Sequence, residues 1–396
     1  MVRPCRFALL VTLIALLAAA IAATPADAAK RKVPFGFFGT AMSPELSDPG
    51  QVSDAALAAQ MGLMARSGVE SVRAYFNWGR IQPSPGSFDW RVSDRLVGGA
   101  ARRRLALTAN VMITPAWASS RPQSSTPHLY APADPRVLAR FMRKLVLRYG
   151  PRGTFWTANP DLPRVPVRQW QLYNEQMASW MWKSRPWART YTRLLKAAYP
   201  AIHRADRGAK VVAGSLVHVG RFSPWDGMTA LYRAGAKRYF DVVAIHPFTN
   251  DSGSVRRTVN QVIDIIDFVR DRMRAAHDAR KPVILTELTW SAAVGRVPER
   301  VLTGLETTSK GQVARMKAVY RRLAKVRRKH RIAEAYWYTW ATQYDGNSEQ
   351  DPSFRFAGLT RWRGGVFSPM PILRTYAQLA ARYEGCRKTS NVRRCR

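Results

Sequence analysis

Short apolar runs alternate with longer segments of helical periodicity along most of this 396-residue chain. This alternation is typical of βαβ units, in which a helix follows each strand of a parallel sheet and covers it. We count eight units, with strands expected at residues 35–39, 72–76, 105–113, 167–173, 210–214, 241–245, 282–286 and 333–340. No internal repeat or low-complexity linker divides the chain, so the pattern predicts a single closed (β/α)8 or TIM barrel with extended loops rather than an open doubly wound sheet.

The helices between these runs are marked by capping residues and apolar stripes. The clearest is expected from Asp134 to Tyr149, because Asp134 suits the N-cap and Pro135 suits the first helical position. Further helices are expected at residues 54–67, 187–204, 255–277, 312–330 and 371–383.

The N-terminus has the pattern of a secretory signal peptide. A basic start precedes an unbroken apolar run from Phe7 to Ala23, and Ala26-Asp27-Ala28 supplies a small-x-small cleavage site. A retained membrane anchor is the alternative, but the run is barely long enough to span a bilayer and has no charged stop on its far side. We therefore expect residues 1–28 to be removed and the mature chain to be secreted to the cell exterior or the envelope.

The remaining chain is expected to form one barrel domain at residues 29–383 and a basic tail at residues 384–396. Cys5 lies in the leader, so only Cys386 and Cys395 remain, either as one disulfide or as two free thiols. No later stretch contains eighteen consecutive apolar residues, so we expect a soluble monomer without stable membrane insertion.

The formal net charge of +37 raises the question of an acidic polymer as a partner. Arginine accounts for 50 of the 63 basic residues, and these are scattered along the chain with only modest clusters. A compositional bias toward arginine explains this pattern without any partner, although an anionic glycan or wall polymer stays open. Zinc-finger, RNP-like and phosphate-loop patterns are absent from the sequence, so we expect no nucleic-acid partner.

Two glutamates follow apolar strands at positions where barrel enzymes carry their chemistry, the C-terminal ends of strands. The run 170–173 leads into Asn174-Glu175, and the run 283–286 leads into Glu287. The chain contains only nine glutamates, and 112 residues separate these two, which is the length of three barrel units. The spacing places them on strands four and seven, from which their side chains can converge.

A pair of carboxylates in unequal environments is the machinery of glycoside hydrolysis. One carboxyl group holds its proton and donates it to the departing sugar oxygen, while the other stays ionised and attacks the anomeric carbon. The ordinary alternative is that Glu175 and Glu287 cap helices or pair with arginines.

The chain resembles clan A of the glycoside hydrolases over nearly its whole mature length, most closely the cellulase-like and β-xylosidase-like branches. The resemblance is carried by Asn174-Glu175 and Glu287, by the stretches 72–78, 81–90, 114–118 and 148–150, and by His246-Pro247. It implies a retaining hydrolase without a cofactor or metal, acting on a poly- or oligosaccharide, with Glu175 as acid/base and Glu287 as nucleophile.

The same resemblance implies roles for supporting residues. Arg73, at the end of strand two, would hold Glu287 ionised, and Asn174 would contact the sugar 2-hydroxyl. His246 would position the carboxylates. Among the many aromatic residues of these loops, Trp117, Trp290 and Trp340 are expected to contact sugar rings, with Trp340 as the floor.

Two departures from the clan pattern keep other functions open. Gln176 follows the acid/base where proline is usual, and Phe248 stands where many members carry a tyrosine that contacts the nucleophile. Tyr338 or Tyr344 could replace that phenol. The alternatives are a non-catalytic carbohydrate-binding barrel and a basic envelope protein that binds an anionic polymer.

Overall fold

The computed structural model describes residues 31–249, 253–343 and 352–385. The expected signal peptide at residues 1–28, Cys5, Tyr344 and the Cys386–Cys395 pair therefore lie outside the described residues.

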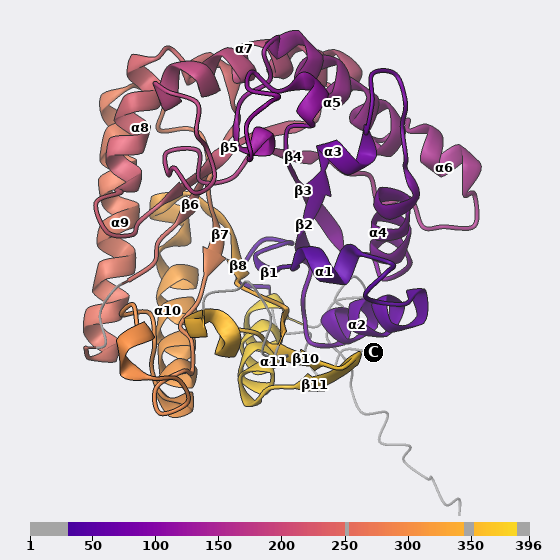
Figure 1. Cartoon of the computed structure of the whole chain (residues 1–396). Coiled ribbons are helices and arrows are strands. Elements are labelled where there is room, and N and C mark those ends of the chain that lie inside the picture. Colours follow the sequence, from indigo (N-terminus) through magenta and orange to yellow (C-terminus); the bar gives the residue numbers. More distant parts are fainter. Residues whose placement is uncertain (1–30, 250–252, 344–351, 386–396) are drawn as a thin grey trace, which may run out of the picture.

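Eight parallel strands close into a barrel, each strand pairing with the next and β8 pairing with β1 (Figure 1). The strands are β1 Phe38–Ala41, β2 Ser71–Asn77, β3 Ala106–Met112, β4 Gln169–Leu172, β5 Lys210–Val217, β6 Val242–His246, β7 Val283–Leu288 and β8 Ile332–Trp337. This confirms the expected (β/α)8 barrel.

Helices surround the barrel and cover the outer faces of its strands (Figure 1). They are α1 Pro44–Ser47, α2 Asp54–Arg66, α3 Trp78–Ile81, α4 Arg91–Arg102, α5 Pro135–Tyr149, α6 Thr154–Ala158, α7 Trp187–Ala205, α8 Pro224–Arg233, α9 Val255–Ala275, α10 Ser309–His330 and α11 Pro371–Glu384. In α5 the Asp134 side chain accepts a hydrogen bond from the Arg136 backbone N–H, and Pro135 occupies the first turn, as the sequence indicated. Among the described residues no helix is both long and apolar enough to cross a bilayer.

Alternate residues of each strand point outward to the helices or inward to the barrel axis. The outward residues join the main hydrophobic core, whereas a small inner cluster contains Val212, Val242, Ala244, Ile284 and Tyr336. Gly39 on β1 is needed beside this cluster, since a Cβ there would lie 2.5 Å from the Tyr336 ring.

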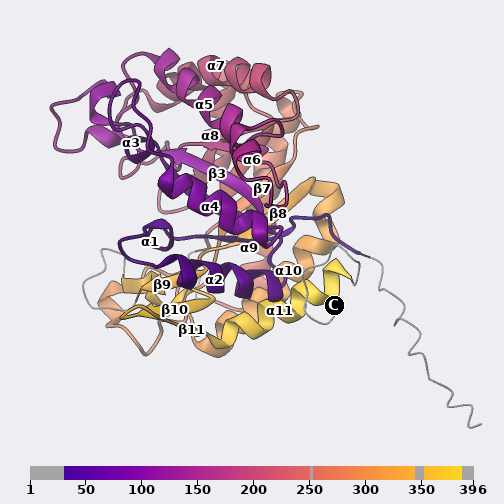
Figure 2. The same cartoon turned by 90° about the vertical axis from the view of Figure 1, so that its right-hand side faces the viewer.

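Three strand bounds differ from the sequence-based expectation in ways that matter for the site. Arg73 is the third residue of β2, not its last, because the strand continues to Asn77. Glu287 is still within β7, and β8 ends at Trp337. The chain beyond β8 forms a separate three-stranded sheet, β9 Ala341–Gln343, β10 Thr360–Arg363 and β11 Val366–Pro369, which lies near α2 and α11 (Figure 2).

Candidate active site

A strained turn at the end of β4 brings Asn174 and Glu175 to the barrel mouth. Tyr173 and Glu175 both have left-handed backbone conformations, with φ of 60° and 44°. Such conformations cost about 1–3 kcal/mol each in residues other than glycine and persist where the surroundings enforce them. The surroundings do so here, because the Tyr173 N–H donates to the Val111 carbonyl and its hydroxyl is hydrogen-bonded to Thr114 at 2.7 Å.

Glu287 reaches the same place from β7 and meets Arg73. The Arg73 side chain points inward from β2, and its Nη1 donates to Glu287 Oε1 at 2.7 Å. Both side chains are buried, with 6% and 8% of the residues exposed. A guanidinium at this distance favours the charged form of a carboxylate.

The remaining donors of Arg73 bind neighbouring amides. Nε donates to Gln171 Oε1 at 2.8 Å, and Nη2 donates to Asn174 Oδ1 at 2.7 Å. The second bond orients the Asn174 amide so that its NH₂ group remains for another acceptor. One arginine therefore positions Glu287 and Asn174 together, from a place lower in the barrel than the sequence indicated.

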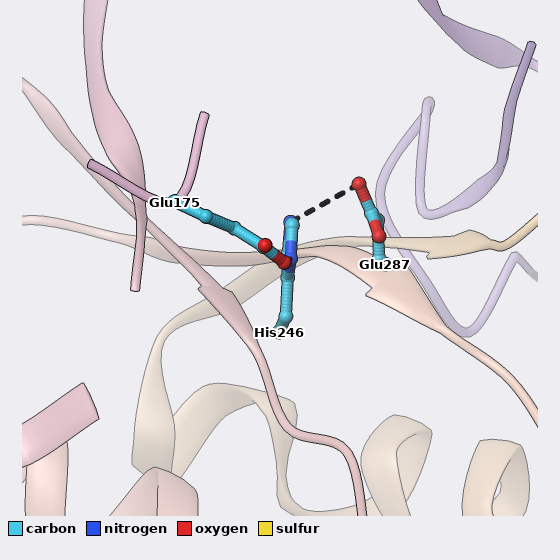
Figure 3. Close-up of side chains that lie close together, drawn as sticks. All are labelled: Glu175, His246 and Glu287. Carbon is cyan, nitrogen blue, oxygen red and sulfur yellow. Dashed lines mark hydrogen bonds and ion pairs between the residues drawn. The ribbon is translucent and has the colours of Figure 1, made fainter. Parts of the chain in front are cut away.

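His246, the last residue of β6, lies between the two glutamates (Figure 3). Its Nδ1 is 2.7 Å from Glu175 Oε1, and its Nε2 is 3.5 Å from Glu287 Oε1. Burial lowers the pKa of His246 to about 3, and the positive charge of Arg73 acts in the same direction although Glu287 opposes it. The imidazole is therefore neutral near pH 7.

The environments of the two carboxyl groups differ. Burial raises the pKa of Glu175 above its ordinary value, against the opposing effects of a hydrogen bond from Trp180 and the charge of Arg73. If Glu175 holds its proton, it donates to Nδ1 of a His246 that carries its own hydrogen on Nε2. This tautomer directs an N–H rather than a lone pair toward Glu287.

One oxygen of Glu175, one oxygen of Glu287 and a ring nitrogen of His246 all lie within 4.8 Å of one another. Retaining glycosidases hold their two carboxyl groups about 5 to 5.5 Å apart, whereas inverting enzymes need about 6.5 to 9.5 Å to admit a water molecule. The short separation between Glu175 and Glu287 is that of a retaining enzyme, in which a carboxylate attacks the sugar directly.

The same three side chains have ligand types that a divalent cation accepts. Arg73 stands 2.7 Å from one of these ligands, and Glu175 and His246 are already hydrogen-bonded to each other. A cation would have to displace both interactions, so we keep the expectation of metal-free chemistry as a prediction.

The structure corrects the choice of aromatic residues at the site. Trp340 and Trp290 are fully buried in the hydrophobic core, where their ring N–H groups donate to Gln60 and Thr249. Trp117 packs edge-on against Trp78 and donates to the Gln82 carbonyl. None of the three lines the cavities beside the glutamates. Trp290 and Trp340 are packed on all sides and have no free face for a sugar ring, whereas Trp117 is partly buried away from these cavities.

Trp180 and Tyr338 each line both of these cavities. Trp180 is 47% exposed, and its Nε1 donates to Glu175 Oε2 at 2.7 Å. Tyr338 follows β8, so it takes the position at the strand end that was expected for Trp340. Tyr338 lies near Trp180 and the glutamates because β8 ends just before it. Apolar patterning does not locate the end of a strand accurately enough to predict this.

Phe248 is buried beside His246, with a ring separation of 5.7 Å, and provides no hydrogen bond to Glu287. Tyr338 is close enough that Glu287 and Glu175 add to the effect of burial in raising the pKa of its hydroxyl. No hydrogen bond joins Tyr338 and Glu287 in the described part of the chain. Arg73 is thus the group that holds the carboxylate of Glu287.

Two cavities meet at Glu287. One, of about 380 Å³, extends over β1 to β3 and is lined by Met42, Arg73, Tyr75 and Ile113 among others. The second, of about 340 Å³, extends over β5 to β7 and is lined by Glu175, Phe248 and Leu305 among others. Asn174, Trp180, Met181, Glu287 and Tyr338 line both.

A family model described as β-galactosidase, that of glycoside hydrolase family 42, matches residues 48–161. This segment contains Arg73 but ends before either glutamate. No protein of curated function matches the sequence.

Solved structures of glycoside hydrolases have the same fold. A family 39 glycoside hydrolase from Bacteroides cellulosilyticus WH2 is 18% identical with a TM-score of 0.60, over 89% of this chain and 64% of that one. An enzyme of subfamily GH5_18 from Bifidobacterium longum subsp. longum, solved with Manβ1-4GlcNAc, is 16% identical with a TM-score of 0.62, over 88% and 78% of the two chains. A family 5 mannosidase from Rhizomucor miehei is 12% identical with a TM-score of 0.57, over 89% and 94%. The chain thus spans under two thirds of the first of these proteins.

Proposed function

We propose that this chain, a TIM-barrel protein of glycoside hydrolase clan A, hydrolyses O-glycosidic bonds with net retention of anomeric configuration. The observation that carries the proposal is the approach of Glu175 and Glu287 to within 4.8 Å, with burial raising the pKa of Glu175 and Arg73 bound to Glu287.

In the first step an oxygen of Glu287 attacks the anomeric carbon, and the bond from that carbon to the leaving oxygen breaks. Glu175 gives its proton to the leaving oxygen, so the departing alcohol is neutral and a glycosyl ester remains on Glu287. In the second step Glu175 takes a proton from water, whose oxygen attacks the anomeric carbon and releases Glu287. Two inversions give net retention.

The neighbouring side chains support these steps. Arg73 holds the carboxylate of Glu287 in place before attack, and the NH₂ group of Asn174 is placed to bind the sugar 2-hydroxyl. Neutral His246 holds Glu175 by a hydrogen bond and lies 3.5 Å from Glu287 without adding a charge.

Secretion remains part of the proposal and depends on the N-terminal sequence pattern, as does the view that the substrate is an extracellular poly- or oligosaccharide. Mass spectrometry of the exported protein should find residue 29 at the N-terminus.

The test of the reaction is a screen of aryl glycosides and polysaccharides, followed by proton NMR of the first product of an active substrate. We expect the anomer of the substrate to appear first. An inverted first product would mean that water attacks directly, and Glu287 would then be a base instead of a nucleophile.

A further inference from the structure

The catalytic mouth has a different charge balance from the rest of the protein. The chain carries 63 basic and 26 acidic residues. A neighbouring cavity of about 270 Å³ shares Tyr75 with the cavity over β1 to β3. Together with the two cavities at Glu287, it is lined by four carboxylates and only two arginines, with His128 the remaining basic side chain.

Both arginines are already paired. Arg73 is bound to Glu287 at 2.7 Å, and Arg80 is bound to Asp48 at 3.0 Å. Of the four carboxyl groups that line these cavities, only those of Glu45 and Glu175 are therefore not paired with an arginine. An anionic sugar would therefore find no unpaired arginine or lysine among the described residues that line these cavities.

Glu45 occupies a distinctive position in this arrangement. It lies on the short helix α1, is only partly buried, and contributes to the raised pKa values of both Tyr75 and Tyr338. Its carboxylate thus acts on the two phenols that border the cavity over β1 to β3. Within the described residues, no hydrogen bond or ion pair involves the Glu45 side chain.

Glu287 and Asn174 line both cavities, whereas Arg73 lines only the one over β1 to β3 and Glu175 only the one over β5 to β7. We therefore assign the cavity over β1 to β3 to the sugar attacked by Glu287, and the cavity beside the proton donor Glu175 to the leaving group. Glu45 lines the neighbouring cavity, which shares Tyr75 with this one. Its carboxylate can accept hydrogen bonds from sugar hydroxyls and repels a sugar carboxylate.

We infer that the sugar cleaved by this protein carries no anionic group, and that Glu45 determines this specificity. The inference rests on the proposed glycosidase function. It means that the high positive charge of the chain does not reflect an anionic substrate in this site, and that a uronic-acid glycan is not cleaved.

Matched pairs of substrates test the inference: 4-nitrophenyl β-glucoside with β-glucuronide, and β-galactoside with β-galacturonide. We expect kcat/KM for the uronide to be lower than for its neutral partner by on the order of 100-fold, because like charges in a partly buried site are strongly unfavourable. Glu45→Gln keeps the shape and removes the charge, so it should reduce this ratio by about tenfold. The control Glu299→Gln removes one charge from an exposed residue outside these linings and should leave the ratio unchanged.

Hydrolysis of a uronide as fast as its neutral partner, or an unchanged ratio in Glu45→Gln, would overturn the inference. If no glycoside is hydrolysed, the proposed function itself fails. Calorimetric binding of methyl galactoside and methyl galacturonide to the wild-type protein and to Glu45→Gln then decides the charge preference, and tighter binding of the uronide to wild type contradicts it.

Discussion

Buried glutamates with raised pKa values occur at both ends of this barrel, yet only one end is arranged for chemistry. At the mouth, Glu175 and Glu287 border open cavities. At the opposite end, Glu70 and Glu384 are fully buried, and neither lines those cavities.

The cluster of Arg31, Glu70 and Glu384 at this opposite end, here called the bottom cluster, differs from the mouth in the partners of its charged groups. Arg31 is bound to Glu70, which also accepts a hydrogen bond from the Gly36 N–H at 2.8 Å. Both carboxyl oxygens of Glu384 lack a hydrogen-bond partner among the described residues. Burial, with the adjacent charge of Glu70, raises the pKa of Glu384 to about 9.

A raised carboxyl pKa is therefore not enough to identify an active site. The mouth adds two features that this other end lacks: hydrogen-bond partners for both carboxyl groups, from Arg73 to Glu287 and from Trp180 and His246 to Glu175, and open space beside them. The following predictions test this contrast.

Glu287→Ala should give the largest effect. Without the nucleophile no glycosyl ester forms, so kcat for every substrate should fall by about 10⁴-fold or more. Steady-state kinetics on the best substrate of the screen measures this. A decrease in kcat of less than tenfold would mean that Glu287 is not the nucleophile and that, like Glu70 and Glu384, it has a structural role only.

Glu175→Ala should separate substrates by their leaving groups. Natural glycans should lose about 10² to 10⁴-fold in rate, the scale of general acid catalysis. An aryl glycoside with a good leaving group needs no proton in the first step, so the glycosyl ester should accumulate and azide should release it as a glycosyl azide of retained configuration. Rates equal to wild type on both substrates would contradict the acid/base role.

Glu384→Gln should change stability without changing kcat. In the folded protein Glu384 keeps its proton up to about pH 9, whereas the unfolded chain releases it near pH 4.5. Wild-type stability should therefore fall as pH rises through this window, and the variant should escape that loss.

The gain in the free energy of unfolding at pH 9 should be several kcal/mol, because the folded protein loses about 1.4 kcal/mol for each pH unit between the two pKa values, and it should be close to zero at pH 4. Urea unfolding at both pH values measures it, with Glu299→Gln as the surface control. A gain that does not depend on pH would show that titration of Glu384 is not its cause.

Trp180→Phe should give the smallest effect, a shift in a pH profile. The indole N–H binds the ionised form of Glu175, so its removal should raise the pKa of Glu175 and move the alkaline limb of kcat/KM upward by about one pH unit. Trp117→Phe is the control, since Trp117 donates to the Gln82 carbonyl instead. A change in KM with an unmoved profile would limit Trp180 to sugar contact.

Much of the fold and the central pair could be predicted from the sequence because both depend on local pattern. Apolar runs of strand length locate the barrel strands, and polar residues at their ends locate Asn174, Glu175 and Glu287, whereas His246 was expected from the family resemblance. The family resemblance implied the bond from Arg73 to Glu287, but not the bonds from Arg73 to Gln171 and Asn174. A strand pattern does not indicate how far a long side chain extends along the barrel interior.

The aromatic contacts could be predicted only poorly. Trp340 and Tyr338 are two residues apart, so an error of two residues in the expected end of β8 changes which of them is predicted to face the cavity. Trp180 lies in an irregular segment after β4, where periodicity gives no signal of side-chain direction. Sequence patterns thus locate strand ends better than they locate the loops that complete a site.

One backbone contact ties the two described ends of the chain together. The Lys32 N–H donates to the Tyr383 carbonyl at 2.8 Å, beside the Arg31–Glu70 pair that precedes β2. Both ends thus meet at the face of the barrel opposite the glutamates. A carrier domain, affinity tag or solid support attached at either end leaves substrate access open, and a short peptide joining them permits a circularly permuted enzyme with new ends in a surface loop.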